Sequence, residues 1–367
     1  MLVFLIAGAR PNFMKISPIY RGSIKYKEIE CKIVHTGQHY DYEMSQSFFD
    51  DLEIPKPDFF LNAGSGTHAS QTAKIMIEFE KLCQKEQPDM VIVVGDVNST
   101  LACSVVAKKL LIDVAHVEAG LRSFDLAMPE EINRMVTDSI SDYFFVTEKS
   151  GVRNLLKEGK QENRTHLVGN VMIDNLFYQV KKLAKIDPHT FSCFELKKRF
   201  HKYIYLTLHR PSNVDSLEKF RSISETLNQI AQKIPIVFPV HPRTKKMMDQ
   251  FKIHLCDKIY QLPPLGFRES LFLWKDAALV MTDSGGLQEE TTALGIPCIT
   301  IRENTERPIT IEKGTNILAG ITKDSILLAF DETIQKKHTE NKRVPDKWDG
   351  KTAERIWKIL RTSRIKP

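Results

Sequence analysis

Short apolar runs alternate along the chain with longer stretches in which apolar residues recur at helical spacing. In the first half the runs cover residues 2–7, 31–35, 90–95, 114–117 and 143–146, and helix-like stretches follow from Pro11, near 41–52, over 99–110, from Pro129 and over 149–158. The runs 91–94 and 144–146 are apolar at every position, as in a parallel sheet that helices cover on both faces. The pattern predicts a doubly wound α/β domain.

A second alternation of the same kind begins after a helix-like stretch over residues 171–183. Its apolar runs cover 203–208, 236–240, 259–262, 279–282 and 298–301, and residues 185–190, with Pro188, have the composition of a linker. From Trp348 an amphipathic helix carries Ile356, Ile359 and Leu360 on one side. We therefore predict two Rossmann-like, doubly wound domains over 1–170 and 171–348, and a C-terminal helix over 349–367 that packs back on the first.

The composition fits a globular protein of two domains, with 367 residues, 42% of them hydrophobic and 27% charged. No apolar run approaches the ~20 residues of a membrane span. The apolar start over residues 1–6 lacks the basic lead-in and the length of a signal peptide, which predicts a cytoplasmic protein with no membrane partner. None of the six cysteines forms a Cys-x-x-Cys pair, so we expect buried, reduced thiols.

The net charge of +6 is compatible with nucleic acid or with an anionic small substrate. Basic residues are scattered, and the denser groups at 197–202 and 355–366 have no interleaved aromatic residues of the kind that bind nucleic acid. The charge therefore favours a small anionic substrate, and we predict no nucleic-acid partner.

Ligands of open α/β sheets lie beyond the carboxyl ends of the strands, so the residues that follow each run are informative. After the first run, Arg10 and Lys15 flank a predicted helix N-terminus, which favours anions; a turn with two solvated cations explains them equally well.

After the run 279–282, Ser284, Gly285 and Gly286 open a helix with a backbone able to cradle a phosphate, and Glu290 lies within reach of a ribose. Capping by Asp283 or Ser284 is the local alternative, but capping does not explain the double glycine. The segment matches neither GxGxxG nor a Walker motif, so no nicotinamide cofactor or P-loop hydrolysis is indicated.

Carboxylates follow the strands of the first half. Asp96 and Glu118 each end a run, and Glu130 and Glu131 follow Pro129. Each alone suits a helix cap or a first helical turn, but several that open onto one crevice are typical of acid/base chemistry. Four histidines occupy similar positions, and two of them are followed by cations at crevice positions fit for a diphosphate: His35, His116, His209-Arg210 and His241-Pro242-Arg243. Their spacing does not indicate a metal site.

The residues alone thus predict a cleft between two α/β domains. We expect a phosphorylated nucleoside on the second domain and carboxylates on the first, which face it. The substrate class is a nucleotide-linked molecule, and the chemistry is acid/base.

Nine motifs in this order resemble the non-hydrolysing bacterial UDP-N-acetylglucosamine 2-epimerases over nearly the whole chain. They are Gly8-Ala9-Arg10-Pro11, Thr36-Gly37-Gln38-His39, Gly95-Asp96, the segment from His116 to Arg122, the segment from Pro129 to Arg134, Gly169-Asn170, His209-Arg210, the segment from Asp283 to Glu290, and Thr305-Glu306-Arg307-Pro308. The resemblance implies the two-domain glycosyltransferase B-type fold and a homodimer.

The family reaction inverts C2 of the sugar of UDP-N-acetylglucosamine and gives UDP-N-acetylmannosamine reversibly, through elimination of UDP to a bound 2-acetamidoglucal. By resemblance Asp96, Glu118 and Glu130 are the catalytic carboxylates. His209 is also predicted as a catalytic residue, and it holds the diphosphate with Arg10, Ser284, Gly285 and Gly286. His241 is a further substrate-binding residue, and Glu290 holds the ribose. Lys15, Arg134 and Arg307 support the site. The reaction needs no metal or other cofactor.

The sequence departs from the family pattern at two places. Ala9-Arg10-Pro11-Asn12 stands where many members have Thr-Arg-Pro-Glu, and residues 40–43 and 64–68 lack side chains that bind a second, activating UDP-N-acetylglucosamine in many members. Allosteric activation and the substituents of the sugar are therefore open. A modified substrate such as a 2,3-diacetamido sugar, a glycosyltransferase on the same fold and a non-enzymatic sugar-nucleotide sensor are the alternatives.

Overall fold

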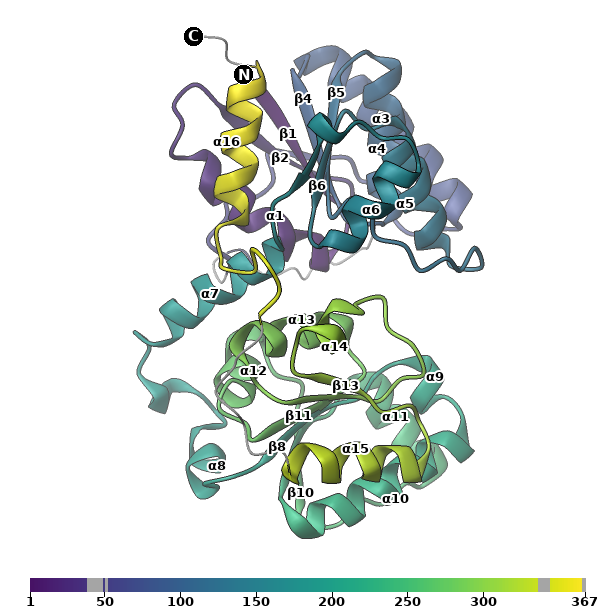
Figure 1. Ribbon diagram of the computed structural model, residues 1–367, viewed down its shortest axis with the longest axis vertical. Coiled ribbons are helices and arrows are strands. Elements are labelled where there is room, and N and C mark those ends of the chain that lie inside the picture. Colours follow the sequence, from purple (N-terminus) through teal and green to yellow (C-terminus); the bar gives the residue numbers. More distant parts are fainter. Residues whose placement is uncertain (38–48, 50–51, 336–343, 365–367) are drawn as a thin grey trace. The chain divides into compact units, whose positions relative to one another are not determined.

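The computed structural model describes the chain except residues 38–48, 50–51, 336–343 and 365–367, and except the side chains of Arg10 and Arg364. It divides into two units (Figure 1), one of Met1–Asn175 with Asp346–Pro367 and one of Leu176–Pro345. The predicted helix near 41–52 and the end of the motif at 36–39 fall mostly outside the described residues. None of the described helices is long and apolar enough to cross a membrane.

The first unit is built on a parallel sheet of seven strands in the order β3-β2-β1-β4-β5-β6-β7. The strands are β1 (Leu2–Ala7), β2 (Glu30–His35), β3 (Phe59–Phe60), β4 (Met90–Val94), β5 (Asp113–Val117), β6 (Tyr143–Val146) and β7 (Thr165–Leu167). The helices are α1 (Arg10–Ser23), α3 (His68–Glu86), α4 (Asn98–Lys109), α5 (Pro129–Ile140), α6 (Lys149–Lys157), the start of α7 (Val171–Leu183), and α16 (Thr352–Arg364).

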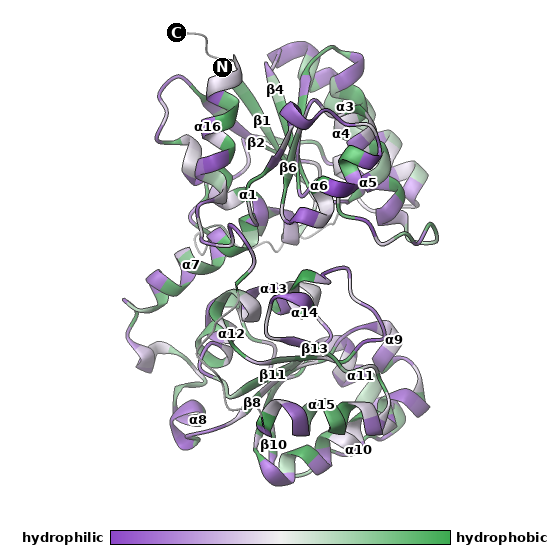
Figure 2. Ribbon diagram, viewed as in Figure 1, coloured by the Kyte–Doolittle hydropathy of each residue, from purple (hydrophilic) through white to green (hydrophobic). Residues whose placement is uncertain are grey.

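Alternating side chains of the central strands explain the unbroken apolar runs. Leu5 and Ile92 belong to one buried cluster, which includes residues of α1 and α16, whereas Phe4 and Val93 belong to another, which includes residues of α3 and α4. Because both faces of β1 and β4 are covered, every position of these strands must be apolar. Figure 2 shows the hydrophobic colouring concentrated on the strands and on the inner sides of the helices.

The second unit repeats this plan with six parallel strands in the order β10-β9-β8-β11-β12-β13. The strands are β8 (Ile204–Thr207), β9 (Ile236–Pro239), β10 (Ile259–Leu262), β11 (Leu279–Thr282), β12 (Cys298–Thr300) and β13 (Asn316–Leu318). The helices are α8 (Phe194–Arg199), α9 (Pro211–Val214), α10 (Leu217–Lys233), α11 (Pro242–Phe251), α12 (Phe267–Trp274), α13 (Gly285–Leu294), α14 (Ile309–Glu312) and α15 (Lys323–Gln335). One sheet face packs on α10 and α15, and on the other the Tyr205 hydroxyl lies 2.6 Å from Ser270 Oγ of α12. The predicted doubly wound α/β class is confirmed in both units.

The division between the units falls inside α7, between Asn175 and Leu176. The first turns of α7 are tied to the first unit, because Asn175 Oδ1 accepts hydrogen bonds from Ser17 and Arg21 of α1. Asp174 accepts the backbone N–H groups of Thr352 and Ala353 and so caps α16. This cap explains why α16 begins at Thr352 and not at Trp348, which is buried in the preceding loop. The indole of Trp357 donates to the Ile19 carbonyl of α1 at 2.8 Å, so α16 packs within the first unit.

Candidate active site

The strand order of both sheets reverses direction at one point, between β1 and β4 in the first unit and between β8 and β11 in the second. Loops at such a point diverge to opposite faces of the sheet and leave space for ligands beyond the carboxyl ends of the strands. The segments at these points are 8–10 and 95–97 in the first unit, and 208–210 and 283–286 in the second. Of the site residues predicted from the sequence, these segments contain Arg10, Asp96, His209, Ser284, Gly285 and Gly286.

Asn12 holds the turn between β1 and α1. Its buried side chain accepts the backbone N–H groups of Gly8 and Ala9 at 3.4 and 3.0 Å, and donates to the Val94 carbonyl at 3.2 Å. The turn is thereby fastened to the end of β4. An amide is suited to this position because it both accepts and donates, whereas an ionised glutamate at the same place only accepts. α1 begins at Arg10, one residue before the predicted start at Pro11.

Glu118 forms a buried ion pair with Lys15. Lys15 Nζ lies 2.6 Å from Glu118 Oε2, and the side chains are 15% and 5% exposed. Glu118 has a backbone φ of +73°, which is uncommon and costly for a residue with a side chain. Strain of this kind persists only where the surroundings fix it, and it directs the Glu118 carboxylate toward Lys15 at the end of β5.

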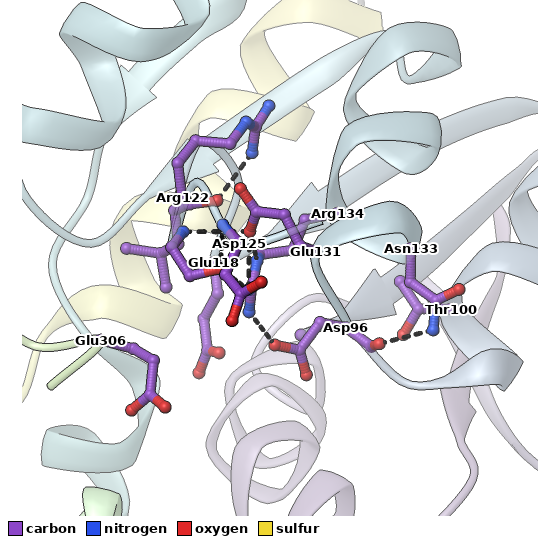
Figure 3. A network of polar contacts seen from close by, with 12 residues as sticks. Asp96, Thr100, Glu118, Arg122, Asp125, Glu131, Asn133, Arg134 and Glu306 are labelled. Carbon is purple, nitrogen blue, oxygen red and sulfur yellow. Dashed lines mark hydrogen bonds and ion pairs between the residues drawn. The ribbon is translucent and has the colours of Figure 1, made fainter. Parts of the chain in front are cut away.

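Asp96 is held by Arg134, which also binds Glu131 (Figure 3). Arg134 Nη1 lies 2.5 Å from Asp96 Oδ2, and Arg134 Nη2 lies 2.7 Å from Glu131 Oε2. Glu131 also accepts the backbone N–H groups of Ser123 and Phe124. Burial raises the pKa of Glu131, but these hydrogen bonds and the Arg134 charge outweigh it and hold the pKa below its usual value. Glu131 therefore positions Arg134, and Asp96, with 30% of its side chain exposed, is the accessible carboxylate of the group.

Glu130 is exposed in the first turn of α5, and the described residues include no ion-pair partner for it. On the buried side of the helix, Asn133 donates to the Asp96 backbone carbonyl at 2.8 Å. The first unit thus brings Asp96 and Glu118 into polar networks with cations, whereas Glu130 lies outside those networks.

Asp283 organises the site of the second unit. It is fully buried, accepts the backbone N–H groups of His209 and Arg210 at 2.8 Å each, and lies 2.9 Å from His209 Nδ1. Burial raises the pKa of Asp283, but the contacts from His209 and Arg210 outweigh it and leave the pKa lowered. The Asp283 carboxylate therefore faces Nδ1 of His209 and leaves Nε2 for a ligand. Sequence reasoning gave Asp283 only a capping role.

The double glycine at the start of α13 leaves the helix N-terminus open. Cβ atoms built at Gly285 and Gly286 would meet no atom within 4 Å, and neither residue has a positive φ. Packing and backbone conformation therefore give no reason for glycine here, which supports close approach of a ligand to the N–H groups. Ser284 occupies the N-cap position, and its side chain makes no capping hydrogen bond.

Glu290 lies one turn further along α13 and is buried. Burial, helped by the charge of neighbouring Glu289, raises the pKa of Glu290 to about 8. Glu289 itself binds Arg307 at 2.7 Å. One of two adjacent carboxyl groups is thus paired and the other is mostly protonated near neutral pH, when it both donates and accepts hydrogen bonds.

His241 follows β9 and accepts the Arg243 N–H on Nδ1, so it caps α11. Its ring centroid lies 5.5 Å from that of His209. Burial and the nearby His209 charge lower the pKa of His241. No group of three His, Cys, Asp or Glu side chains with metal-binding geometry occurs among the described residues.

Comparison with known proteins matches nearly the whole chain to one family. The sequence model of the UDP-N-acetylglucosamine 2-epimerase family matches residues 23–361. The UDP-N-acetylglucosamine 2-epimerase of Methanocaldococcus jannaschii is 45% identical over 366 residues, which are 98% of this chain and 99% of that protein. A crystal structure of an M. jannaschii UDP-GlcNAc 2-epimerase in complex with UDP-GlcNAc and UDP has 44% identity and a TM-score of 0.85, and covers 99% of this chain and 100% of its own.

A relative with a different substrate is nearly as similar. The UDP-2,3-diacetamido-2,3-dideoxy-D-glucuronate 2-epimerase of Pseudomonas aeruginosa is 40% identical over 340 residues, which are 92% of this chain and 93% of that protein. All these relatives are named as 2-epimerases of UDP-linked amino sugars.

Proposed function

The chain belongs to the UDP-N-acetylglucosamine 2-epimerase family, and we propose that it interconverts UDP-N-acetylglucosamine and UDP-N-acetylmannosamine. In the proposed route the C1–O bond to the diphosphate breaks and a carboxylate takes the proton from C2, so that UDP and 2-acetamidoglucal form in the site. A proton then returns to C2 from the opposite face, and a diphosphate oxygen re-forms the bond to C1. No atom changes its net oxidation state over the cycle, so the route uses no redox cofactor.

The second unit holds UDP in this proposal. The open N–H groups at Ser284, Gly285 and Gly286 bind the diphosphate together with His209 and His241. Arg10 belongs to the first unit and is assigned to the diphosphate on family resemblance alone. Glu290 binds the ribose, and Arg307 stabilises the site through Glu289. These donors favour the leaving UDP because its negative charge grows as the C1–O bond breaks.

The first unit supplies the carboxylates. Asp96 and Glu118 each lie against a cation, Arg134 and Lys15 respectively. A neighbouring cation favours the ionised form of a carboxylate, which is the form that accepts a proton and stabilises a developing positive sugar. These two paired carboxylates beside the switch point of the first sheet are the observation that carries the proposal. Glu130 is assigned on family resemblance.

Proton NMR of the purified protein with UDP-N-acetylglucosamine in deuterated water tests the proposal. We expect UDP-N-acetylmannosamine signals and deuterium at C2 in both sugars. A glycosyltransferase leaves the C2–H bond intact, and a sugar-nucleotide sensor binds without turnover. Release of free N-acetylmannosamine with UDP would indicate hydrolysis instead.

A 2,3-diacetamido UDP-sugar is the second candidate substrate, because the P. aeruginosa relative is 40% identical and is named for such a sugar. The same NMR assay with that nucleotide distinguishes the candidates through the ratio of the two kcat/KM values. The homodimer and the cytoplasmic location remain predictions of the family resemblance and of the sequence.

A further inference from the structure

A group of buried charges lies next to the carboxylates, and the proposed reaction gives it no role. It consists of His116 on β5, Asp138 in the last turn of α5, and Arg122 in the loop after β5; their side chains are at most 1% exposed. Arg122 Nη1 lies 2.7 Å from Asp138 Oδ2, and its Nη2 lies 2.7 Å from Glu158. Burial of charge is costly, and apolar residues of similar volume would commonly serve stability as well.

The group connects the two turns that carry the carboxylates. His116 Nε2 lies 2.9 Å from the carbonyl oxygen of Gly95, the residue before Asp96. His116 Nδ1 lies 2.6 Å from Asp138 Oδ1, and Asp138 Oδ2 accepts the N–H of Gly120, two residues after Glu118, at 3.0 Å. One continuous chain of contacts therefore runs from Gly95 through His116 and Asp138 to Gly120.

Both turns have backbones that need such support. Gly95 and Gly120 have φ of +68° and +79°, and Glu118 between them in sequence has +73°. A Cβ at Gly120 would lie 2.4 Å from the Gly151 carbonyl oxygen, so this turn also packs tightly against α6. A left-handed Glu118 flanked by these contacts has little freedom to relax.

The two partners of His116 also determine its charge. A neutral imidazole has one N–H and one lone pair, so one of its two short contacts would bring a lone pair against an oxygen. Both contacts are hydrogen bonds when the ring carries two protons. Protonation of Asp138 is the alternative, but its carboxylate also faces Arg122 and the Gly120 N–H. Burial raises the pKa of Asp138, but the charges and hydrogen bonds of His116 and Arg122 outweigh it and leave the pKa lowered.

We propose that His116, as an imidazolium, and Asp138 are positioning residues. They hold the turn that carries Asp96 and the turn that carries Glu118 at fixed positions relative to each other. The charged side chains that face the pair are Arg122 and, through Arg122, Glu158, so the four charges balance. Neither His116 nor Asp138 touches the sugar. They act because proton removal and proton return need two carboxylates held at fixed places on one sheet edge. The kinetic part of this proposal rests on the proposed epimerisation.

Asp138→Asn is the principal variant, because asparagine keeps the size and removes the charge. We expect kcat to fall about 10- to 100-fold, as for ~1 Å misplacements of reacting groups, while KM for UDP-N-acetylglucosamine changes less than about threefold. His116→Gln, which can donate to only one of the two oxygens, is expected to behave in the same way. Glu158→Gln is the matched control: it removes the exposed end of the charge group, and its kcat should stay within about twofold of wild type.

The amount of free 2-acetamidoglucal released per epimerised product separates positioning from a structural defect. When the two turns are displaced relative to each other, elimination can proceed without the return of the proton. We therefore expect this ratio to rise in Asp138→Asn and His116→Gln and to stay unchanged in Glu158→Gln. A variant that merely contains fewer folded molecules loses all rates in proportion and keeps the ratio. An unchanged ratio, or a kcat within about threefold of wild type, would overturn the positioning role.

The charge of His116 is tested without any activity. In wild-type protein labelled with ¹⁵N-histidine, we expect both ring nitrogens of His116 to carry protons at neutral pH, because each faces an oxygen atom. The signals of His116 are identified as those that vanish in His116→Gln. A single ring proton at neutral pH would overturn the imidazolium pair, whether or not Asp138→Asn folds. If wild type does not turn over UDP-N-acetylglucosamine, the proposed function fails, and this ring measurement still decides the state of the pair.

Discussion

The two units share a strand order but differ in how they equip the point where that order reverses. In the first unit the reversal is surrounded by side-chain ion pairs, Lys15 with Glu118 and Arg134 with Asp96. In the second it is surrounded by backbone N–H groups, because the double glycine leaves the start of α13 open and Asp283 turns inward to hold His209. Under the proposed function, the same scaffold carries charged groups that move protons in one unit and uncharged donors that hold an anion in the other.

The shared fold determines where a ligand is expected in each unit, and a few residues at that place determine the chemistry. In both units a buried aspartate without a ligand-facing role organises the neighbouring loops: Asp138 in the first and Asp283 in the second. Asp138 accepts one backbone N–H group and Asp283 accepts two, and a histidine Nδ1 lies 2.6 Å from Asp138 and 2.9 Å from Asp283. We expect substitutions in the first unit to change turnover and those in the second to change UDP affinity.

Substitution of the paired carboxylates should have the largest effect. We expect Asp96→Asn and Glu118→Gln to lower kcat by ~10²–10⁴-fold, the usual range for loss of a general acid or base. UDP affinity, measured by calorimetry, should change less than about threefold, because the diphosphate is assigned to the second unit. Parallel loss of turnover and of UDP binding would mean that these carboxylates shape the nucleotide pocket instead.

A substitution that fills the open N-terminus of α13 should have a smaller effect, and this effect should be on UDP affinity. Gly285→Ala is expected to weaken UDP binding about tenfold, because the methyl group occupies the approach to the N–H groups. The melting temperature should not fall, since the added Cβ meets no atom within 4 Å. Gly120→Ala is the contrasting control: with φ of +79° and a clash with Gly151, it should lower the melting temperature without weakening UDP binding to the folded protein. Wild-type affinity in Gly285→Ala would remove this glycine from the phosphate site.

The pH dependence of stability should show the smallest effect. The pKa of Glu290 is raised to about 8 in the fold, so between its ordinary value near 4.5 and about pH 8 the folded state binds more protons than the unfolded state. The stability that the neutral carboxyl provides is therefore present at low pH and lost as the pH rises through this window. Glu290→Gln, which stays neutral, should flatten the fall in melting temperature between about pH 6 and 8.5, measured without ligand. Equal slopes for the two proteins would show that Glu290 is ionised in the fold.

Much of the fold followed from the periodicity of apolar residues. The runs that became β1, β4, β6 and β11 were recognisable because both of their faces are buried. The short strands β3, β7 and β13 were not predicted, because two or three residues, partly exposed, carry too little pattern. The start of α16 was also missed, since it is set by Asp174, 178 residues away from Thr352 in the chain.

The sequence by itself determined the α/β class and the residues that stand at strand ends, because strand periodicity and glycine at turns are local properties of the chain. Only the tertiary structure decided which of these residues act together. Asn12 reaches Val94 across 82 positions, His209 reaches Asp283 across 74, and His116 reaches Asp138 across 22. Such contacts depend on strand order and on the register of parallel strands, which arise from packing of the whole sheet. A local pattern therefore finds the carboxylates, whereas the buried partners that set their charge and direction appear only when the chain is folded.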